Sequence, residues 1–354
     1  MRFAILNDTH AGVRNSSDIF IKYQEDFYTK VFFPYLLEND IKHIVHLGDY
    51  YEHRRFINFK ALNANRTHFL DKLREYGITM DIIPGNHDTY FKNTNELNSL
   101  KELLGHYLNE VNIVMRPTVM DYDGLKFGLV PWICQDNEEE TNEFLANCKA
   151  DMIGGHFELA GFEIMKGMKM TGMGNSSHNL KRFELVVSGH YHTKSNEGNI
   201  HYLGSQMEFF WNDAGDHKYF HIVDTADRSL TPVRNPITLY EKILYDDEKI
   251  DYNEYDDSIF DNKFVKVVVI NKTDAFTFDR FLDRIQNRKI YDLKIQENLE
   301  GFLGDNVDVG EVQIEDTSEL LRTYVDNTET ILDKDRLKKE LIDLHIEAET
   351  FEIA

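Results

Sequence analysis

The chain has 354 residues, of which 39 are Lys or Arg and 62 are Asp or Glu, so its formal net charge is −23. A hydrophobic fraction of 42% and a charged fraction of 29% exclude a disordered chain and predict a soluble protein of about two domains. The charge argues against a protein that holds nucleic acid on a basic surface, because Lys and Arg supply most of that affinity. Two cysteines and no long apolar segment predict neither a disulfide framework nor a membrane span.

The first part of the chain alternates short apolar segments with helical patterns. Strands are predicted at 2–7, 42–47 and 79–84, and helices at 18–38 and 59–76. After a predicted helix at 95–108, strands dominate, at 111–115, 118–121, 125–131, 151–155, 184–188, 199–203 and 218–224. The alternation is typical of an α/β fold, in which we expect two stacked mixed β-sheets flanked by helices.

The pattern changes near 225–237, where two prolines and polar residues predict a break. We therefore expect a first domain at 1–234 and a small α+β domain at 235–297, followed by an acidic linker at 298–316 and a helical region at 317–354. The small domain is predicted to contain strands at 237–244, 263–270 and 290–296 and a helix at 276–288. The helical region is predicted to contain helices at 317–326 and 334–350. Most of the negative charge, −15 of −23, lies after residue 235.

Five short polar clusters follow predicted strands of the first domain. They are Asp8-Thr9-His10, Gly48-Asp49, Gly85-Asn86-His87-Asp88, Gly155-His156 and Gly189-His190-Tyr191-His192. One such cluster would be weak, because a single His at a strand end is more often a capping or core residue. Loops that leave the carboxyl ends of strands converge on one crevice, so five clusters in this order predict a single pocket.

The pocket has the ligand types of a site for two divalent metal ions. Imidazole and carboxylate groups without a thiolate suit manganese, iron or zinc. Because ions in two-metal sites lie roughly 3.5–4 Å apart, one carboxylate must be shared, and Asp49 is the natural candidate.

These clusters resemble the signature of the calcineurin-like metallophosphoesterases, over about residues 1–225. Within that family the chain is similar to SbcD-type nuclease subunits of recombination and double-strand-break repair complexes, most of all to those of T-even-like phages. The segments that carry this similarity are GLKFGLVPW at 124–132, HFELAGF at 156–162 and YLGS at 202–205. Protein phosphatases of the family have Asp-Arg-Gly after the second cluster and Glu in the third, which this chain lacks. The resemblance implies a four-layer sandwich with a small α+β cap and a C-terminal helical pair.

The resemblance also implies a role for each matched residue. One metal ion is expected on Asp8, His10 and His192, a second on Asn86, His156 and His190, with Asp49 bridging the two.

His87 is expected to face the scissile phosphate and to stabilise the transition state or protonate the leaving oxygen. Some relatives carry an auxiliary His three residues after the bridging Asp. Here that position is Glu52, and a role for the neighbouring His53 stays open.

The same resemblance implies a metal-dependent DNA exonuclease and endonuclease with two divalent ions, Mn²⁺ or alternatively Mg²⁺. It is expected to act in DNA replication, recombination and repair in the cytoplasm of a bacterium or a phage-infected cell. Its expected partners are DNA, a second copy of the chain bound through helices 59–76 and 95–108, and an SbcC-type SMC-like ABC ATPase. Since the chain is acidic, we expect it to hold DNA weakly alone, with the metal ions and the ATPase contributing to affinity.

The ATPase is expected to bind the C-terminal apolar stripe Leu337, Leu341 and Leu344, although packing on the chain's own cap is an alternative for this stripe. The aromatic run Phe209-Phe210-Trp211 is predicted to pack in the core or a loop rather than to stack on nucleic acid.

Two other functions stay open. One is hydrolysis of a small phosphodiester, a nucleotide or a phosphoprotein, and the other is a scaffold without catalysis, against which the intact ligand set argues.

Overall fold

A computed structural model describes residues 1–165, 168–169, 177–297, 325 and 333–351. The chain divides into two compact units, Met1–Thr238 and Leu239–Ala354. No helix in the described residues is long and apolar enough to span a bilayer.

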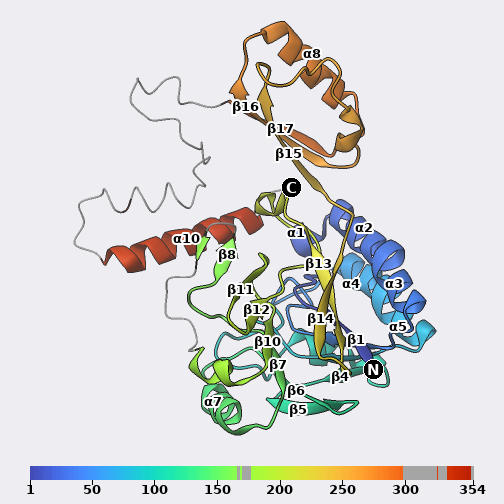
Figure 1. Cartoon of the computed structure of the whole chain (residues 1–354), viewed down its shortest axis with the longest axis vertical. Coiled ribbons are helices and arrows are strands. Elements are labelled where there is room, and N and C mark those ends of the chain that lie inside the picture. Colours follow the sequence, from blue (N-terminus) through green and yellow to red (C-terminus); the bar gives the residue numbers. More distant parts are fainter. Residues whose placement is uncertain (166–167, 170–176, 298–324, 326–332, 352–354) are drawn as a thin grey trace. The chain divides into compact units, whose positions relative to one another are not determined.

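Unit 1 is built on two six-stranded mixed sheets (Figure 1). The first has the order β14 (Ser229–Arg234), β13 (Tyr219–Asp224), β1 (Arg2–Leu6), β2 (His43–His46), β3 (Thr79–Ile82), β4 (Val111–Ile113). The second has the order β11 (Ser195–Glu197), β12 (Ile200–Tyr202), β10 (Leu185–Ser188), β7 (Met152–Gly155), β6 (Leu125–Val130), β5 (Thr118–Tyr122). Strands β1 to β4 are parallel, and so are β6, β7, β10 and β12. A short pair, β8 (Glu163–Met165) and β9 (Met168–Lys169), forms a separate ribbon.

Apolar side chains from both sheets form one core between them, including Phe3, Val45, Phe127 and Val187. Helices cover the outer face of the first sheet, where the rings of Phe27 and Phe32 pack on Phe220 of β13. These helices are α2 (Asp18–Phe27), α3 (Phe33–Glu38), α4 (Phe59–Asn65) and α5 (Asp71–Tyr76), with α1 (Val13–Ser16) preceding them. One π-helical turn joins α2 to α3, and a second joins α4 to α5.

The outer face of the second sheet is covered by α7 (Glu138–Asn147) and a 3₁₀ turn at His178–Arg182. Leu145 of α7 and Leu180 of the turn join Val186 and Ile200 in a second core. The α/β expectation of two stacked mixed sheets flanked by helices is therefore confirmed, although the sequence did not predict α7.

Two predictions about local structure were wrong. The helix predicted at 95–108 is only α6 (Ser99–Leu103) followed by a 3₁₀ turn, because the Asn98 side chain accepts a hydrogen bond from the Lys101 amide and caps a later start. The break predicted at 225–237 contains strand β14. Its Pro232 is tolerated because β14 is an edge strand of the sheet.

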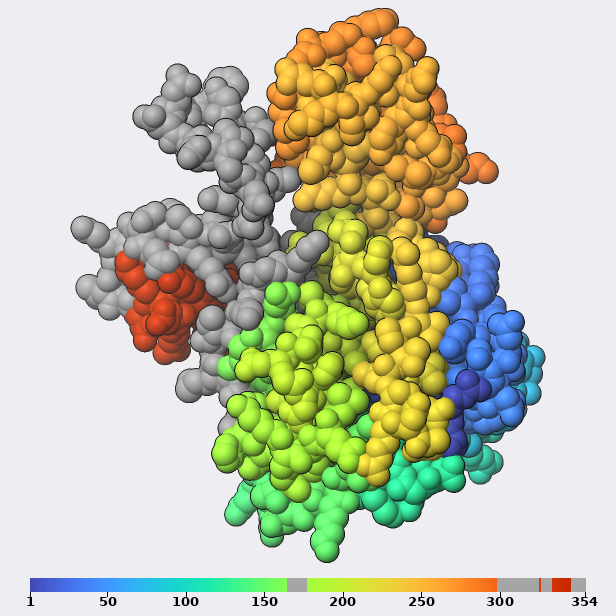
Figure 2. All heavy atoms as spheres, in the orientation of Figure 1, coloured from blue at the N-terminus to red at the C-terminus, as the bar shows by residue number. Residues whose placement is uncertain are grey.

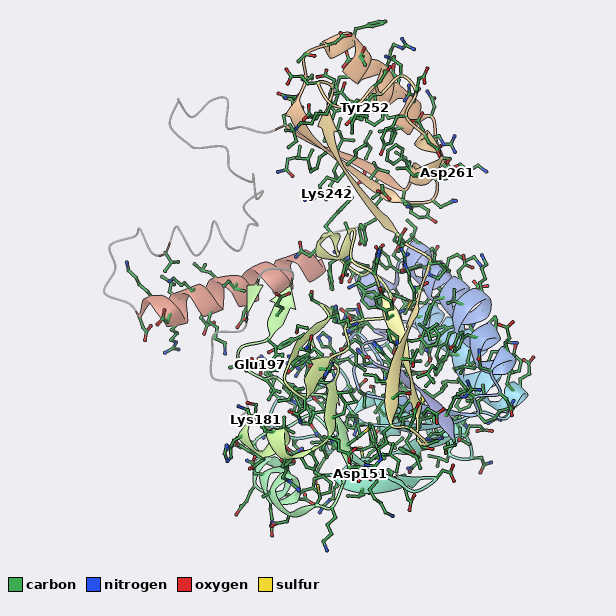
Figure 3. The ribbon with its side chains drawn as sticks, in the orientation of Figure 1. Asp151, Lys181, Glu197, Lys242, Tyr252 and Asp261 are labelled. Carbon is green, nitrogen blue, oxygen red and sulfur yellow. The ribbon has the colours of Figure 1, made fainter. Side chains whose placement is uncertain are left out.

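Unit 2 contains a parallel three-stranded sheet of β15 (Tyr240–Asp246), β16 (Phe264–Asn271) and β17 (Asp292–Glu297). Helix α8 (Ala275–Gln286) packs Phe278, Phe281 and Ile285 into its core. Tyr252, labelled in Figure 3, is fully buried there and stacks on Tyr245 at a centroid distance of 4.2 Å. Helix α10 spans Lys334–Phe351, whereas the predicted linker 298–316 and helix 317–326 lie outside the described residues apart from Val325.

Candidate metal centre

The predicted ligands all follow the carboxyl ends of strands in unit 1. Asp8 and His10 follow β1, Asp49 follows β2, Asn86 follows β3, His156 follows β7, and His190 and His192 follow β10. Because these strands run in parallel within their sheets, their ends converge at one edge of the sandwich.

Asp8, His10 and His192 form one group of candidate ligands. Their potential ligand atoms lie within 4.8 Å of one another. Nε2 of His10 lies 3.1 Å from Nε2 of His192 and 3.9 Å from Oδ1 of Asp8. These are the three residues that the sequence assigned to the first ion.

Asp49, His156 and His190 form a second group with the same spacing. The Asn86 amide oxygen belongs beside them, since it lies 2.9 Å from Nε2 of His156 and 2.9 Å from Nδ1 of His190. Oδ2 of Asp49 lies 3.3 Å from Nε2 of His156 and 3.8 Å from Nε2 of His10. The Asp49 carboxylate therefore lies between the two groups, where a bridging ligand must be.

Four of the candidate ligands have a strained backbone conformation with a positive φ angle. Asp8, His10, Asp49 and His190 have positive φ angles of 47°, 44°, 54° and 85°. Non-glycine residues rarely adopt this left-handed region, at a cost of about 1–3 kcal/mol each, and such residues gather at functional sites.

Glycine permits the close approach of the loops after β2 and β3. A Cβ on Gly85 would overlap the carboxylate and the backbone nitrogen of Asp49. A Cβ on Gly48, where φ is +89°, would lie 2.8 Å from Nδ1 of His156. Any side chain at either position would displace the candidate bridging ligand or its neighbour.

The charges of the two groups favour bound cations. Burial lowers the pKa of His10, but Glu52 and Asp49 outweigh burial and raise it to about 9. Burial likewise opposes charge on His156, but Asp49 raises the pKa of its imidazole to about 9. The carboxylates thus draw positive charge into a buried pocket, and divalent ions bound to neutral imidazoles would supply that charge.

Glu52 and His87 complete the polar arrangement around His10. Oε2 of Glu52 lies 2.6 Å from Nδ1 of His10, and the carboxylate is buried. Nδ1 of His87 lies 2.7 Å from the carbonyl oxygen of Glu52, and the His87 amide donates to Oδ1 of Asp49 at 2.8 Å. Glu52, which stands where some relatives carry an auxiliary His, therefore contacts the candidate ligand His10 directly. The neighbouring His53 is half-buried and stacks on Phe56.

Comparison with known proteins agrees with this geometry. Residues 1–194 match the calcineurin-like phosphoesterase family. The chain belongs to that family. It is 30% identical over 338 residues, 95% of each chain, to exonuclease subunit 1 of Enterobacteria phage T4.

Two solved structures are more distant. An archaeal phosphodiesterase is 14% identical, with a TM-score of 0.34 over 66% of this chain and 100% of that one. A glutamine-dependent NAD⁺ synthetase from Acinetobacter baumannii is 11% identical, with a TM-score of 0.26 over 98% of this chain and 72% of that one. Both scores are too low to support an argument about function.

Two supporting residues of this calcineurin-like phosphoesterase were missed by sequence reasoning. The buried Asp88 carboxylate accepts hydrogen bonds from the amides of Tyr50, Tyr51 and Gly85, and so joins the loops after β2 and β3. The Gln24 side chain donates to the carbonyl oxygens of Thr9 and His10 at 2.7 and 3.2 Å. Asp88 could have been found, since it ends the most specific of the five clusters, but nothing in the sequence points to Gln24.

Aromatic side chains enclose the phosphoesterase site. Phe209 is fully buried, and its ring centroid lies 5.6 Å from that of His10, as expected for a packing residue. Phe210 is half-buried and stacks on His192 at 5.9 Å, while Trp132 lies 5.3 Å from His190. These rings restrict the rotamers of the candidate ligands.

Proposed function

We propose that this chain is the catalytic subunit of a metal-dependent DNA nuclease, an exonuclease and endonuclease that hydrolyses phosphodiester bonds. The observation that carries the proposal is the convergence of every predicted ligand on two adjacent groups, in a chain that is 30% identical to an exonuclease subunit over 95% of both lengths. A scaffold without catalysis would not need this buried and strained arrangement.

Asp8, His10 and His192 would hold one divalent ion, and Asn86, His156 and His190 the other, with Asp49 shared. The donor set contains no thiolate and mixes imidazole with oxygen ligands, which supports Mn²⁺ and also accommodates Mg²⁺. When bound, such ions neutralise the phosphodiester and activate water for in-line attack.

His87 is proposed to act on the substrate. A proton on its Nδ1 would be donated to the carbonyl oxygen of Glu52, which lies 2.7 Å away. That hydrogen bond fixes the ring and leaves Nε2 to stabilise charge on the phosphate or to carry the proton for the leaving oxygen. Its amide, bonded to Asp49, ties the position of His87 to the candidate bridging carboxylate.

DNA binding by unit 2 is supported by a row of lysines. Lys242, Lys266 and Lys294 lie opposite one another in register across the three parallel strands, and Lys242 is labelled in Figure 3. Lysines at matching positions of adjacent strands place their ammonium groups on one face of the sheet, where they can contact a phosphate backbone. Lys242→Gln should weaken binding of linear DNA and reduce its salt dependence in a filter-binding assay, and unchanged binding would remove this support.

Two further partners are proposed for the subunit. Phe56 and Phe59 near the start of α4 are 64% and 83% exposed, which supports a homodimer through this surface. Light scattering of Phe59→Asp tests this dimer.

In α10, Leu344 is 58% exposed, while Leu337 and Leu341 are half-buried. This stripe is proposed to bind an SbcC-type ATPase, and Leu344→Asp should then reduce co-purification with it.

One experiment separates the possible activities. The purified chain is incubated with Mn²⁺ or Mg²⁺ and linear DNA, or with bis-p-nitrophenyl phosphate, with and without the ATPase. His87→Asn is compared with wild type and with His106→Asn, a matched substitution of an exposed His. DNA degradation that only His87→Asn abolishes supports the proposal. Dye release without DNA cleavage, even with the ATPase, would indicate a small phosphodiester as substrate. No turnover with metal demonstrably bound would indicate a scaffold.

A further inference from the structure

A cavity of about 540 Å³ opens between the two sheets of unit 1, where β10 and β12 face β13 and β14. The atoms of β12 and β14, yellow-green and yellow, border each other on the face shown in Figure 2. None of the predicted metal ligands lines this cavity, and Leu185, Leu203 and Leu230 form part of its wall. Its volume falls in the range of about 300–1,000 Å³ that is typical of small-molecule sites.

Two histidines occupy inward positions of the strands beside the cavity. His221 of β13 lies opposite Ile5 of β1, which belongs to the core between the sheets, and the next inward residue, Val223, also lies in that core. From the other sheet, His201 of β12 lies two residues before Leu203, which is again a core residue. Because side chains alternate between the faces of a strand, both imidazoles stand where apolar residues would complete the core.

One ring nitrogen of His221 is unsatisfied among the described residues. The His221 side chain is 2% exposed, and its Nδ1 has no hydrogen-bond partner in the part of the chain that the structure describes. A buried polar nitrogen without a partner destabilises the fold, so its presence at a core position calls for a ligand.

The charged group that acts on the two imidazoles is the Lys194 ammonium. The Lys194 ammonium lines the cavity and lies 5.2 Å from the centre of the Tyr219 ring. The acidic residue of the cavity wall, Glu184, is bound to Arg228, which also lies 3.4 Å from Asp151, a residue labelled in Figure 3. Burial and then Lys194 lower the pKa of His201 and His221, the latter to about 3. Burial and the ammonium therefore both favour the neutral form of these imidazoles, while Lys194 leaves one positive charge for an anion to pair with.

This combination fits an organic anion better than a metal ion. Among the described residues, neither His201 nor His221 belongs to a group of three potential metal ligands. Two imidazoles and an ammonium offer three nitrogen donors, which match the three acceptor oxygens of a phosphate monoester better than the two of a carboxylate. The leucine side chains of the wall provide apolar contacts for a ring attached to that phosphate.

We propose that this cavity binds a small organic phosphate of mononucleotide size, with the phosphate held by Lys194, His201 and His221 and the ring against Leu185, Leu203 and Leu230. The site is separate from the candidate metal centre and does not require metal. The proposal therefore does not depend on the proposed nuclease activity.

Isothermal titration of the full chain with deoxyadenosine monophosphate tests the proposal, in phosphate-free buffer with EDTA so that no metal ion contributes. Deoxyadenosine and inorganic phosphate serve as the two partial ligands. We expect the mononucleotide to bind, phosphate to bind more weakly and deoxyadenosine not to bind. Lys194→Gln, which removes one charged donor from an exposed residue, should weaken binding by about tenfold or more.

Two further variants locate the binding. His221→Phe should abolish it, while Lys149→Gln, an exposed lysine elsewhere in unit 1, and His87→Asn should bind as wild type does. If His221→Phe does not fold, Lys194→Gln still decides the question. No binding at millimolar mononucleotide, equal binding of deoxyadenosine or of phosphate, or loss of binding only in His87→Asn would each overturn the proposal.

Discussion

Unit 1 contains buried histidines in two places, and two of those at the candidate metal centre, His10 and His156, differ in charge from His221 at the cavity. At the candidate metal centre, burial opposes charge on His10 and His156, but Glu52 and Asp49 raise each pKa to about 9. At the cavity between the sheets, burial and then Lys194 lower the pKa of His221 to about 3. Burial lowers the pKa in both places, and only a carboxylate in direct contact reverses it: His190 and His192 of the candidate metal centre, which burial dominates, also have lowered pKa values. The carboxylates at His10 and His156 therefore favour cations, whereas the charged group that acts on His221 is the Lys194 ammonium, which favours an anion.

The largest test of this comparison removes the carboxylate of Asp49, the proposed bridging ligand. Asp49→Asn keeps the shape of the side chain but removes the charge between His10 and His156. We expect phosphodiester hydrolysis to fall on the order of 10³-fold or more, because several kcal/mol of charge stabilisation depend on metal binding. Titration calorimetry with Mn²⁺ and hydrolysis of bis-p-nitrophenyl phosphate measure the two effects.

Asp136→Asn, an exposed aspartate of the same unit, is the matched control and should behave as wild type. Asp49→Asn with full Mn²⁺ occupancy and activity within tenfold of wild type would contradict the assignment of Asp49 as the bridging ligand.

Glu52→Gln tests the carboxylate that orients His10. Carboxylates that accept from metal-binding histidines typically contribute 10–100-fold in metal affinity or activity. We expect a loss of about this size in Mn²⁺ affinity, with kcat largely restored at saturating Mn²⁺, because Glu52 acts through His10. Glu75→Gln, an exposed residue, is the control. Lower kcat with unchanged Mn²⁺ affinity would show that Glu52 does not act by positioning His10.

The sequence was sufficient to predict that these side chains converge on one pocket, because each lies within a short cluster at the end of an apolar strand, whereas their assignment to individual ions came from the family resemblance. A residue directly after a strand lies at the carboxyl end of that strand, and the carboxyl ends of parallel strands lie at the same edge of the sheet. The contact of Glu52 with His10 joins two different loops, and nothing in either loop's own sequence specifies it. The same holds for Gln24, which reaches Thr9 and His10 from helix α2.

The cavity between the sheets could not be predicted for a similar reason. His201 and His221 are separated along the chain and come from different sheets, so only sheet stacking brings them to one space. Strand β14, which helps to enclose it, was predicted as a break because Pro232 is unfavourable in a central strand. Its edge position became evident only from the sheet order.

Gly85→Ala tests how closely the loops after β2 and β3 must approach. The added Cβ would overlap Asp49, and the backbone shift that relieves it should cost about 1–3 kcal/mol of folding free energy. For a domain of this size that corresponds to about 2–4 °C in Tm per kcal/mol. Gly105→Ala is the control, since its Cβ would meet nothing within 4 Å. Equal Tm values for the two variants, measured by circular dichroism, would show that the loop contact is not tight.

The smallest effect concerns the pH dependence that His221 brings to stability. Its pKa is about 3 in the folded chain, against an ordinary value of 6.5, so the unfolded chain takes up the proton first as pH falls. The free energy of unfolding should therefore decrease below about pH 6.5, by at most about 1.4 kcal/mol per pH unit from this group. His221→Phe should remove that contribution, so the stability of this variant relative to wild type should rise as the pH falls from 7 to 5.

Urea unfolding in phosphate-free buffer measures this difference, with His106→Gln as the exposed control. Parallel pH profiles for wild type and His221→Phe would mean that His221 is protonated in the folded chain, which would remove the contrast with His10 and His156.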